Sequence, residues 1–113
     1  MIVNPLRTLA ERTRGVIGRE PVDFEQVFLF NEIYPGDGFH MRGVKGALDI
    51  IFLDRDLGVV GIVPGVIPEA GTATAPPGTT YAAEVMVGGA DHYGLKVGKV
   101  WIGLSNQVLG GGI

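Results

Sequence analysis

Apolar residues are nearly continuous over residues 47–54 (ALDIIFLD), which makes this segment the strongest predicted strand of the chain. Such a run is typical of a strand that is covered on both faces. A polar turn at 55–58 separates it from the apolar residues 59–63, and this spacing predicts a hairpin. Asp49 is the acid placed where this strand becomes almost wholly apolar.

Three further segments have the composition of strands. In residues 24–30 (FEQVFLF) the phenylalanines alternate with other residues, so Phe28 and Phe30 share one face. We expect a short strand at 39–41 and another at 81–87 (YAAEVMV), followed by one helical turn within 89–94. The proline-rich residues 64–80 predict a long surface loop.

The first residues predict a short helix. Asn4 would cap it and Pro5 would take the first helical position. Leu6, Leu9 and Ala10 would then share one apolar face, and Gly15 with Gly18 would end the helix.

The C-terminal residues 100–109 (VWIGLSNQVL) alternate well enough to predict a strand. This strand would either complete the sheet or add to the sheet edge of a neighbouring molecule. The glycines of the last residues would fray unless something holds them, which favours an assembly tail at 103–113. The candidate interaction residues are Trp101, Ile102, Leu104, Val108 and Leu109.

The composition limits the class of protein. A length of 113 residues fits a single domain over residues 1–113, and 19 glycines with 7 prolines favour short strands. A net charge of −3 gives no general attraction to nucleic acid, and no apolar run approaches the roughly 20 residues of a membrane span. The chain has no cysteine, which excludes a disulfide scaffold and a thiolate site. The first residues lack a signal-peptide core, so we expect a cytoplasmic protein, or a virion component if the protein is viral.

Five short motifs occur in a family-like order. They comprise Arg12, Gly15 and Arg19; Phe39 and Met41; residues 48–54; Glu84 and Val85; and Gly94, Lys96, Val97 and Gly98. Over roughly 12–100 the chain resembles the bacterial and archaeal family called domain of unknown function 192. The resemblance implies a compact, mainly β fold with a small barrel-like or rolled antiparallel sheet, and no established activity. The chain departs from the family pattern at His40, where the family usually has Trp.

Asp49 and Glu84 are acids within otherwise apolar strands. If the two carboxylates faced each other, they could act as an acid–base pair. The favoured interpretation is structural, because a buried acid is costly without a partner. The expected partners are Arg12, Arg19 or a backbone amide.

Other chemistry has little support. The two histidines, His40 and His92, lack the spacing of a metal site, so we expect no metal or cofactor. Ser105 is the single serine and has no nucleophile-elbow pattern around it.

The favoured function is therefore a non-catalytic structural or interaction subunit that packs against copies of itself or a larger complex, such as a virus particle. The alternative is a small-ligand binding module with a pocket under the proline-rich loop, lined by Arg19, His40, Met41, Asp49 and Glu84. An enzyme that uses Asp49 and Glu84 is the least favoured of the three.

Overall fold

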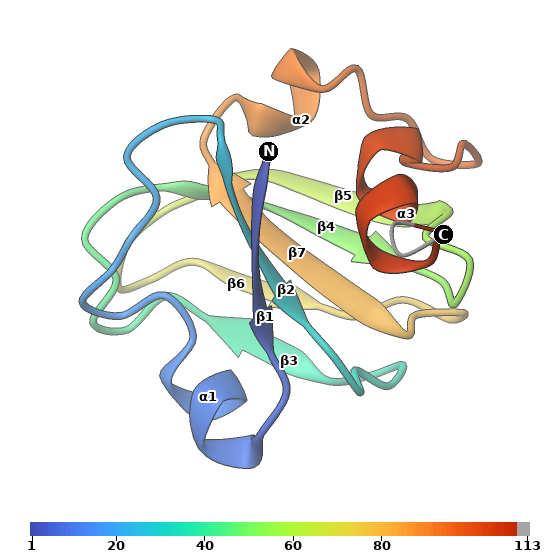
Figure 1. Ribbon diagram of the computed structural model, residues 1–113. Coiled ribbons are helices and arrows are strands. Elements are labelled where there is room, and N and C mark those ends of the chain that lie inside the picture. Colours follow the sequence, from blue (N-terminus) through green and yellow to red (C-terminus); the bar gives the residue numbers. More distant parts are fainter. Residues whose placement is uncertain (111–113) are drawn as a thin grey trace.

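A five-stranded mixed sheet runs through the middle of the molecule (Figure 1). The computed structural model describes residues 1–110. The strands of this sheet follow the order β1, β2, β7, β4, β5, and a second sheet consists of β3 and β6. The elements along the chain are β1 (Ile2–Leu6), α1 (Leu9–Arg14), β2 (Gln26–Phe30), β3 (Gly38–His40), β4 (Leu48–Leu53), β5 (Val59–Val66), β6 (Thr72–Thr74), β7 (Tyr81–Met86), α2 (Gly89–His92) and α3 (Ile102–Val108).

The mainly β class is confirmed, but the barrel is wrong. Among residues 1–110, β1 and β5 form separate edges of the five-stranded sheet and do not pair with each other. The sheet is also not wholly antiparallel, because β1 runs parallel to β2. Each face of the open sheet is covered by a separate layer, so the fold buries its apolar residues without closing.

The two faces of the sheet carry two apolar clusters. Leu48, Ile50 and Phe52 of β4 belong to the first cluster, which packs under β3, β6 and the segment after α1. The alternate residues Ile51 and Leu53 belong to the second cluster, which packs against the C-terminal part of the chain. All six residues of β4 are buried, as the continuous apolar run predicts.

The N-terminal helix begins later than the sequence predicts. Residues 2–6 form β1, an edge strand in which Pro5 is tolerated because edge strands can lack a backbone donor. The helix α1 follows a capping box, in which the Thr8 hydroxyl accepts from the Glu11 amide and the Glu11 carboxylate accepts from the Thr8 amide. The end at Gly15 agrees with the prediction.

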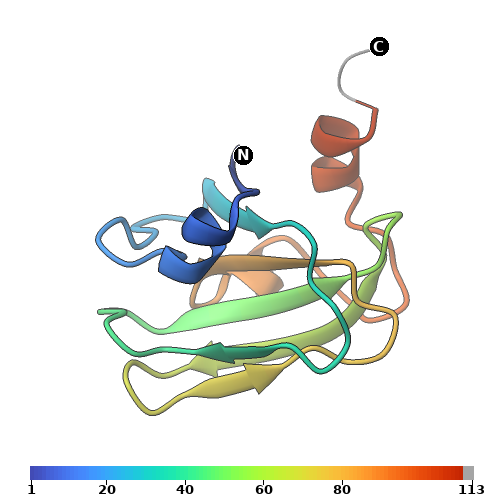
Figure 2. The same cartoon turned by 90° about the horizontal axis from the view of Figure 1, so that it is seen from below.

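The C-terminal segment is a helix, so the predicted strand is wrong. Its buried residues Trp101 and Leu104 and the half-buried Val108 are three and four positions apart, which is the spacing of one helix face. Figures 1 and 2 both place α3 beside the hairpin between β4 and β5, and the Trp101 amide donates to the Leu57 carbonyl at 3.0 Å.

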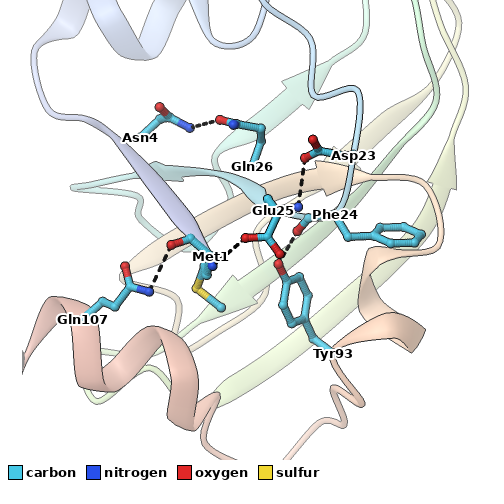
Figure 3. Close-up of polar contacts among 8 residues, drawn as sticks. All are labelled: Met1, Asn4, Asp23, Phe24, Glu25, Gln26, Tyr93 and Gln107. Carbon is cyan, nitrogen blue, oxygen red and sulfur yellow. Dashed lines mark hydrogen bonds and ion pairs between the residues drawn. The ribbon is translucent and has the colours of Figure 1, made fainter.

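A polar network fixes α3 and α2 to the first strands (Figure 3). The Gln107 side chain donates to the Met1 carbonyl at 3.2 Å, and the Met1 amine pairs with the Glu25 carboxylate at 2.9 Å. The Tyr93 hydroxyl donates to the Phe24 carbonyl. The tail is therefore part of the fold up to residue 110, while residues 111–113 of the predicted assembly tail lie outside the described residues.

The proline-rich residues 64–80 are only partly a loop. The strand β5 continues to Val66, and β6 pairs antiparallel with β3 within this segment. Within residues 1–110, none of the helices is both long and apolar enough to span a membrane.

Candidate functional site

The two buried carboxylates lie on opposite faces of the five-stranded sheet. In the pairing of β4 with β7, Asp49 is opposite Val85, whereas Glu84 is opposite Ile50. Directly opposed residues share a face, and neighbours along a strand point to opposite faces. Glu84 therefore points to the side of the first cluster and Asp49 to the side of the second, so the two acids do not form a pair.

Backbone amides hold the Asp49 carboxylate. Its Oδ1 accepts from the Gly65 amide at 2.9 Å, and its Oδ2 accepts from the amides of Gly88 and Ala90 at 3.1 and 3.0 Å. These bonds link β4 to the bend in β5 and to the start of α2. Asp49 thus satisfies its charge within the fold and ties three segments together.

Glu84 is in a different position. Glu84 is only 4% exposed, and no hydrogen bond to its carboxylate is found within residues 1–110. No fully buried side-chain oxygen of these residues lacks a partner, so the small exposed part of Glu84 includes its carboxylate oxygens. Burial raises the pKa of this carboxyl to about 7, because leaving water penalises the charged form. A strongly shifted acid in a cleft is a recognised sign of a functional site.

Glu84 lies at a cavity of about 340 Å³ on the first-cluster side of the sheet. The cavity lies between the end of α1 with the segment that follows it and the region around β3. Its lining residues are Arg12, Thr13, Arg14, Gly15, Val16, Ile17, Phe30, Ile33, Asp37, Gly38, Phe39, His40, Arg42, Val44 and Glu84. It therefore combines an apolar wall with charged groups.

Two glycines allow the walls of the cavity to approach closely. Gly15 has a φ of 57°, and a Cβ there would lie 3.3 Å from Cζ of Phe30. Gly43 has a φ of 80°, and a Cβ there would lie 3.4 Å from Cδ1 of Ile17. Both values of φ favour glycine, so the backbone at these positions shapes the site.

Three guanidinium groups line the cavity. Arg12 donates to the Arg7 carbonyl and lies 3.7 Å from the Glu32 carboxylate. The Nε of Arg14 donates to the Ile17 carbonyl at 3.1 Å. The exposed Arg42 guanidinium has no hydrogen-bond or ion-pair partner among residues 1–110.

The residues that the sequence suggested as one pocket do not come together. His40 and Glu84 line the cavity, with the Nδ1 of His40 accepting from the Arg42 amide at 3.3 Å. Met41 is fully buried in the first cluster and lies outside the lining. Arg19 is exposed and its guanidinium lies 5.3 Å from the centre of the Phe28 ring.

The position of the cavity also differs from the prediction. It lies beside α1 and β3, and none of its lining residues comes from the proline-rich segment 64–80. Sequence reasoning missed Arg14 and Arg42 as lining residues and treated Arg12 only as a partner for a buried acid. The available signal was the Arg-rich motif around α1 next to Gly15, although the sequence does not show where that motif packs.

The proposed interaction residues divide between core and surface. Trp101 and Leu104 are buried in the second cluster, and Val108 packs against it. Ile102 and Leu109 are exposed by 68% and 50%, so they alone of this set offer apolar surface. In the described part of the chain, no group of three or more His, Asp or Glu side chains is arranged to hold a metal ion.

Comparisons with known proteins agree with the motifs. A protein of unknown function from Novosphingobium aromaticivorans DSM 12444 has a similar structure, with a TM-score of 0.74 and 29% identity over 83% of this chain and 69% of that one. A candidate transcription regulator from Sinorhizobium meliloti 1021 shares the fold, with a TM-score of 0.78 and 20% identity over 87% of this chain and 78% of that one. No match is found among curated proteins. The model of the DUF192 family, described as uncharacterized ACR, matches residues 2–101, and the chain therefore belongs to the DUF192 family.

Proposed function

We propose that the chain is a small-ligand binding module and that the cavity at Glu84 is its binding site. One observation carries this proposal: a buried carboxyl without a donor lies at a cavity of about 340 Å³. Small-molecule pockets typically have volumes of about 300–1,000 Å³ and a few convergent polar groups within mainly apolar walls. The cavity at Glu84 has such a volume, and its lining combines apolar side chains with a comparable share of polar and charged ones.

The energetics of Glu84 support a binding role. A carboxylate that is buried without a partner destabilises the folded protein, whereas a ligand that donates a hydrogen bond to it would remove part of that cost. Asp49 shows how the same fold satisfies a buried acid that has a structural task, because three backbone amides hold it. The contrast between the two acids favours Glu84 as the group that a ligand completes.

A binding role is favoured over acid–base catalysis by two carboxylates. Asp49 and Glu84 point to opposite faces of the sheet, so no single substrate can lie between them. The charged and titratable groups that accompany Glu84 at the cavity are three arginines, His40 and Asp37, and they suit recognition of a charged or polar ligand.

Fragment screening by NMR tests the proposal. With the ¹⁵N-labelled full chain and a collection of small amines, acids and alcohols, we expect shifts of the amides at 15–17 and 38–44, which surround the cavity. The variant Glu84→Gln should lose the response to the amines while staying folded. The matched control is Asp56→Asn, which removes one charge from an exposed turn residue outside the cavity lining. If no fragment shifts these amides in the wild type, the proposal is wrong.

A second candidate is self-assembly through the surface around α3. Four apolar side chains are at least half exposed there, namely Val97, Val100, Ile102 and Leu109. Exposed apolar side chains of this kind are typical of protein contact surfaces where they are contiguous. Such self-assembly could serve within a larger structure such as a virus particle. If the chain self-assembles through this surface, light scattering should find an oligomer for the wild type and a monomer for Ile102→Ser. A monomeric wild type would contradict it.

A further inference from the structure

The cavity at Glu84 has two electrostatic ends. Glu84 forms the buried end, with an exposed fraction of 4%. At the rim, Arg14, Arg42 and His40 are exposed, and the Arg12 side chain is 20% exposed. Asp37 is the other acid in the lining, and its carboxylate already accepts from the Tyr34 amide at 2.9 Å. Positive charge therefore dominates the rim, and a single acid occupies the interior.

The interior end selects a hydrogen-bond donor. An ionised carboxylate only accepts hydrogen bonds, and charge-assisted bonds from a cation are the strongest of this kind. A protonated amine satisfies both requirements. A ligand carboxylate at the same position would face the like charge of Glu84.

The rim selects an anion. The guanidiniums of Arg12 and Arg14 are held by backbone carbonyls, so their positive charges have fixed positions. Arg42 keeps its donors available, and a guanidinium can bind a carboxylate through two parallel hydrogen bonds. A ligand that carried positive charge alone would be repelled by this rim.

Apolar side chains also line the cavity. Val16, Ile17, Phe30, Phe39 and Val44 contribute to the lining, and they suit a short chain of methylene groups. We propose that the cavity binds a compact zwitterion, with an amine on Glu84, a short aliphatic spacer along the apolar wall, and a carboxylate on Arg42. This inference rests on the proposed function, since it names the ligand class for the same site.

Three compounds with the same number of carbon atoms test the two ends of the cavity separately. The probes are 5-aminopentanoate, pentanoate, which lacks the amine, and pentylamine, which lacks the carboxylate. Titrations of the ¹⁵N-labelled full chain at pH 8 give a Kd for each. We expect both single-ended compounds to bind at least about tenfold more weakly, since a hydrogen bond to a charged group contributes about that much or more.

Two variants assign the ends to residues. Glu84→Gln should abolish the preference for 5-aminopentanoate over pentanoate, and Arg42→Gln should abolish its preference over pentylamine. Lys45→Gln is the matched control for Arg42, because Lys45 is an exposed neighbouring cation outside the cavity lining. It should leave both preferences unchanged.

The outcomes separate the two proposals. If pentylamine or pentanoate binds as tightly as 5-aminopentanoate, the two-ended ligand is wrong while the binding site stands. If Arg42→Gln keeps the full preference over pentylamine, the assignment of the carboxylate to Arg42 is overturned. If neither these probes nor the fragment collection shifts the amides around the cavity, the binding function fails as well.

Discussion

The variant Glu84→Gln should change how the stability of the protein depends on pH. The folded-state pKa of Glu84 is about 7, against an ordinary value of 4.5 that applies to the unfolded chain. Below pH 4.5 the carboxyl is protonated in both states and contributes no pH dependence. As the pH rises from 4.5 to 7, the unfolded chain releases the proton while the folded protein keeps it, so unfolding becomes more favourable.

The size of the effect follows from these two pKa values. Their separation corresponds to a loss of about 3 kcal/mol of unfolding free energy, which is complete above pH 7. Glutamine has a similar shape and does not titrate, so this particular loss is absent in Glu84→Gln. The unfolding free energy of the variant minus that of wild type should therefore rise by about 3 kcal/mol from pH 4 to pH 8.

Urea denaturation of both proteins at pH 4, 6 and 8 measures this difference. The two proteins differ at this one side chain, so contributions from distant groups cancel in the comparison. If the free energies of wild type and variant change in parallel over this range, Glu84 is hydrated or paired, and the reasoning from its burial is refuted.

Four further substitutions test the wall of the cavity and the packing on the opposite face of the sheet. In Asp49→Asn, the side-chain NH2 group faces at least one of the backbone amides that now donate to the carboxylate, and both groups are donors. We expect a loss of about 3 kcal/mol of unfolding free energy in urea denaturation. A loss below about 0.5 kcal/mol, the size of an ordinary surface change, would show that these hydrogen bonds contribute little. Gly15→Ala forces a side chain onto a backbone with φ 57° and ψ −129° and against Phe30, so we expect a loss of about 1–3 kcal/mol together with altered amide shifts around the cavity, and an unchanged spectrum would argue against this geometry. Leu104→Ala should cost about 2–5 kcal/mol because Leu104 is fully buried, whereas Ile102→Ala, at an exposed position of the same helix, should stay within about 0.5 kcal/mol; equal effects would contradict the orientation of α3.

The core strands were predictable because burial on two faces leaves a direct mark on the sequence. The run from Leu48 to Leu53 has no polar residue except Asp49, and such a run is typical of a strand with apolar layers on both sides. The alternation of Val27 and Leu29 with Phe28 and Phe30 likewise assigns these residues to the second and first clusters. Such patterns are local, so a single sequence contains them.

The ends of the chain were harder to predict because two local signals compete there. Asn4 followed by Pro5 is a good helix start, but pairing with β2 makes these residues a strand, and the capping box at Thr8 starts the helix four residues later. In the tail, Val100, Ile102 and Leu104 fit a strand, whereas Trp101, Leu104 and Val108 fit a helix. Packing against the second cluster favours the helix.

The candidate site was only half predictable. Glu84 stood out as an acid in an apolar strand, but its face depends on the register between β4 and β7, which the sequence does not give. Arg42 reaches the same cavity through tertiary packing of the segment after β3 against α1. The resemblance to a family without an established activity does not indicate that Glu84 and Arg42 line one cavity.

The most direct test of the site is a pH titration of the Glu84 side-chain carboxyl by ¹³C NMR in the free protein. We expect a midpoint near pH 7, because burial raises the pKa of this carboxyl and no group of residues 1–110 donates a hydrogen bond to it. A midpoint near the ordinary value of 4.5 would contradict a role of Glu84 in ligand binding, since the carboxylate would then be hydrated or paired in the free protein.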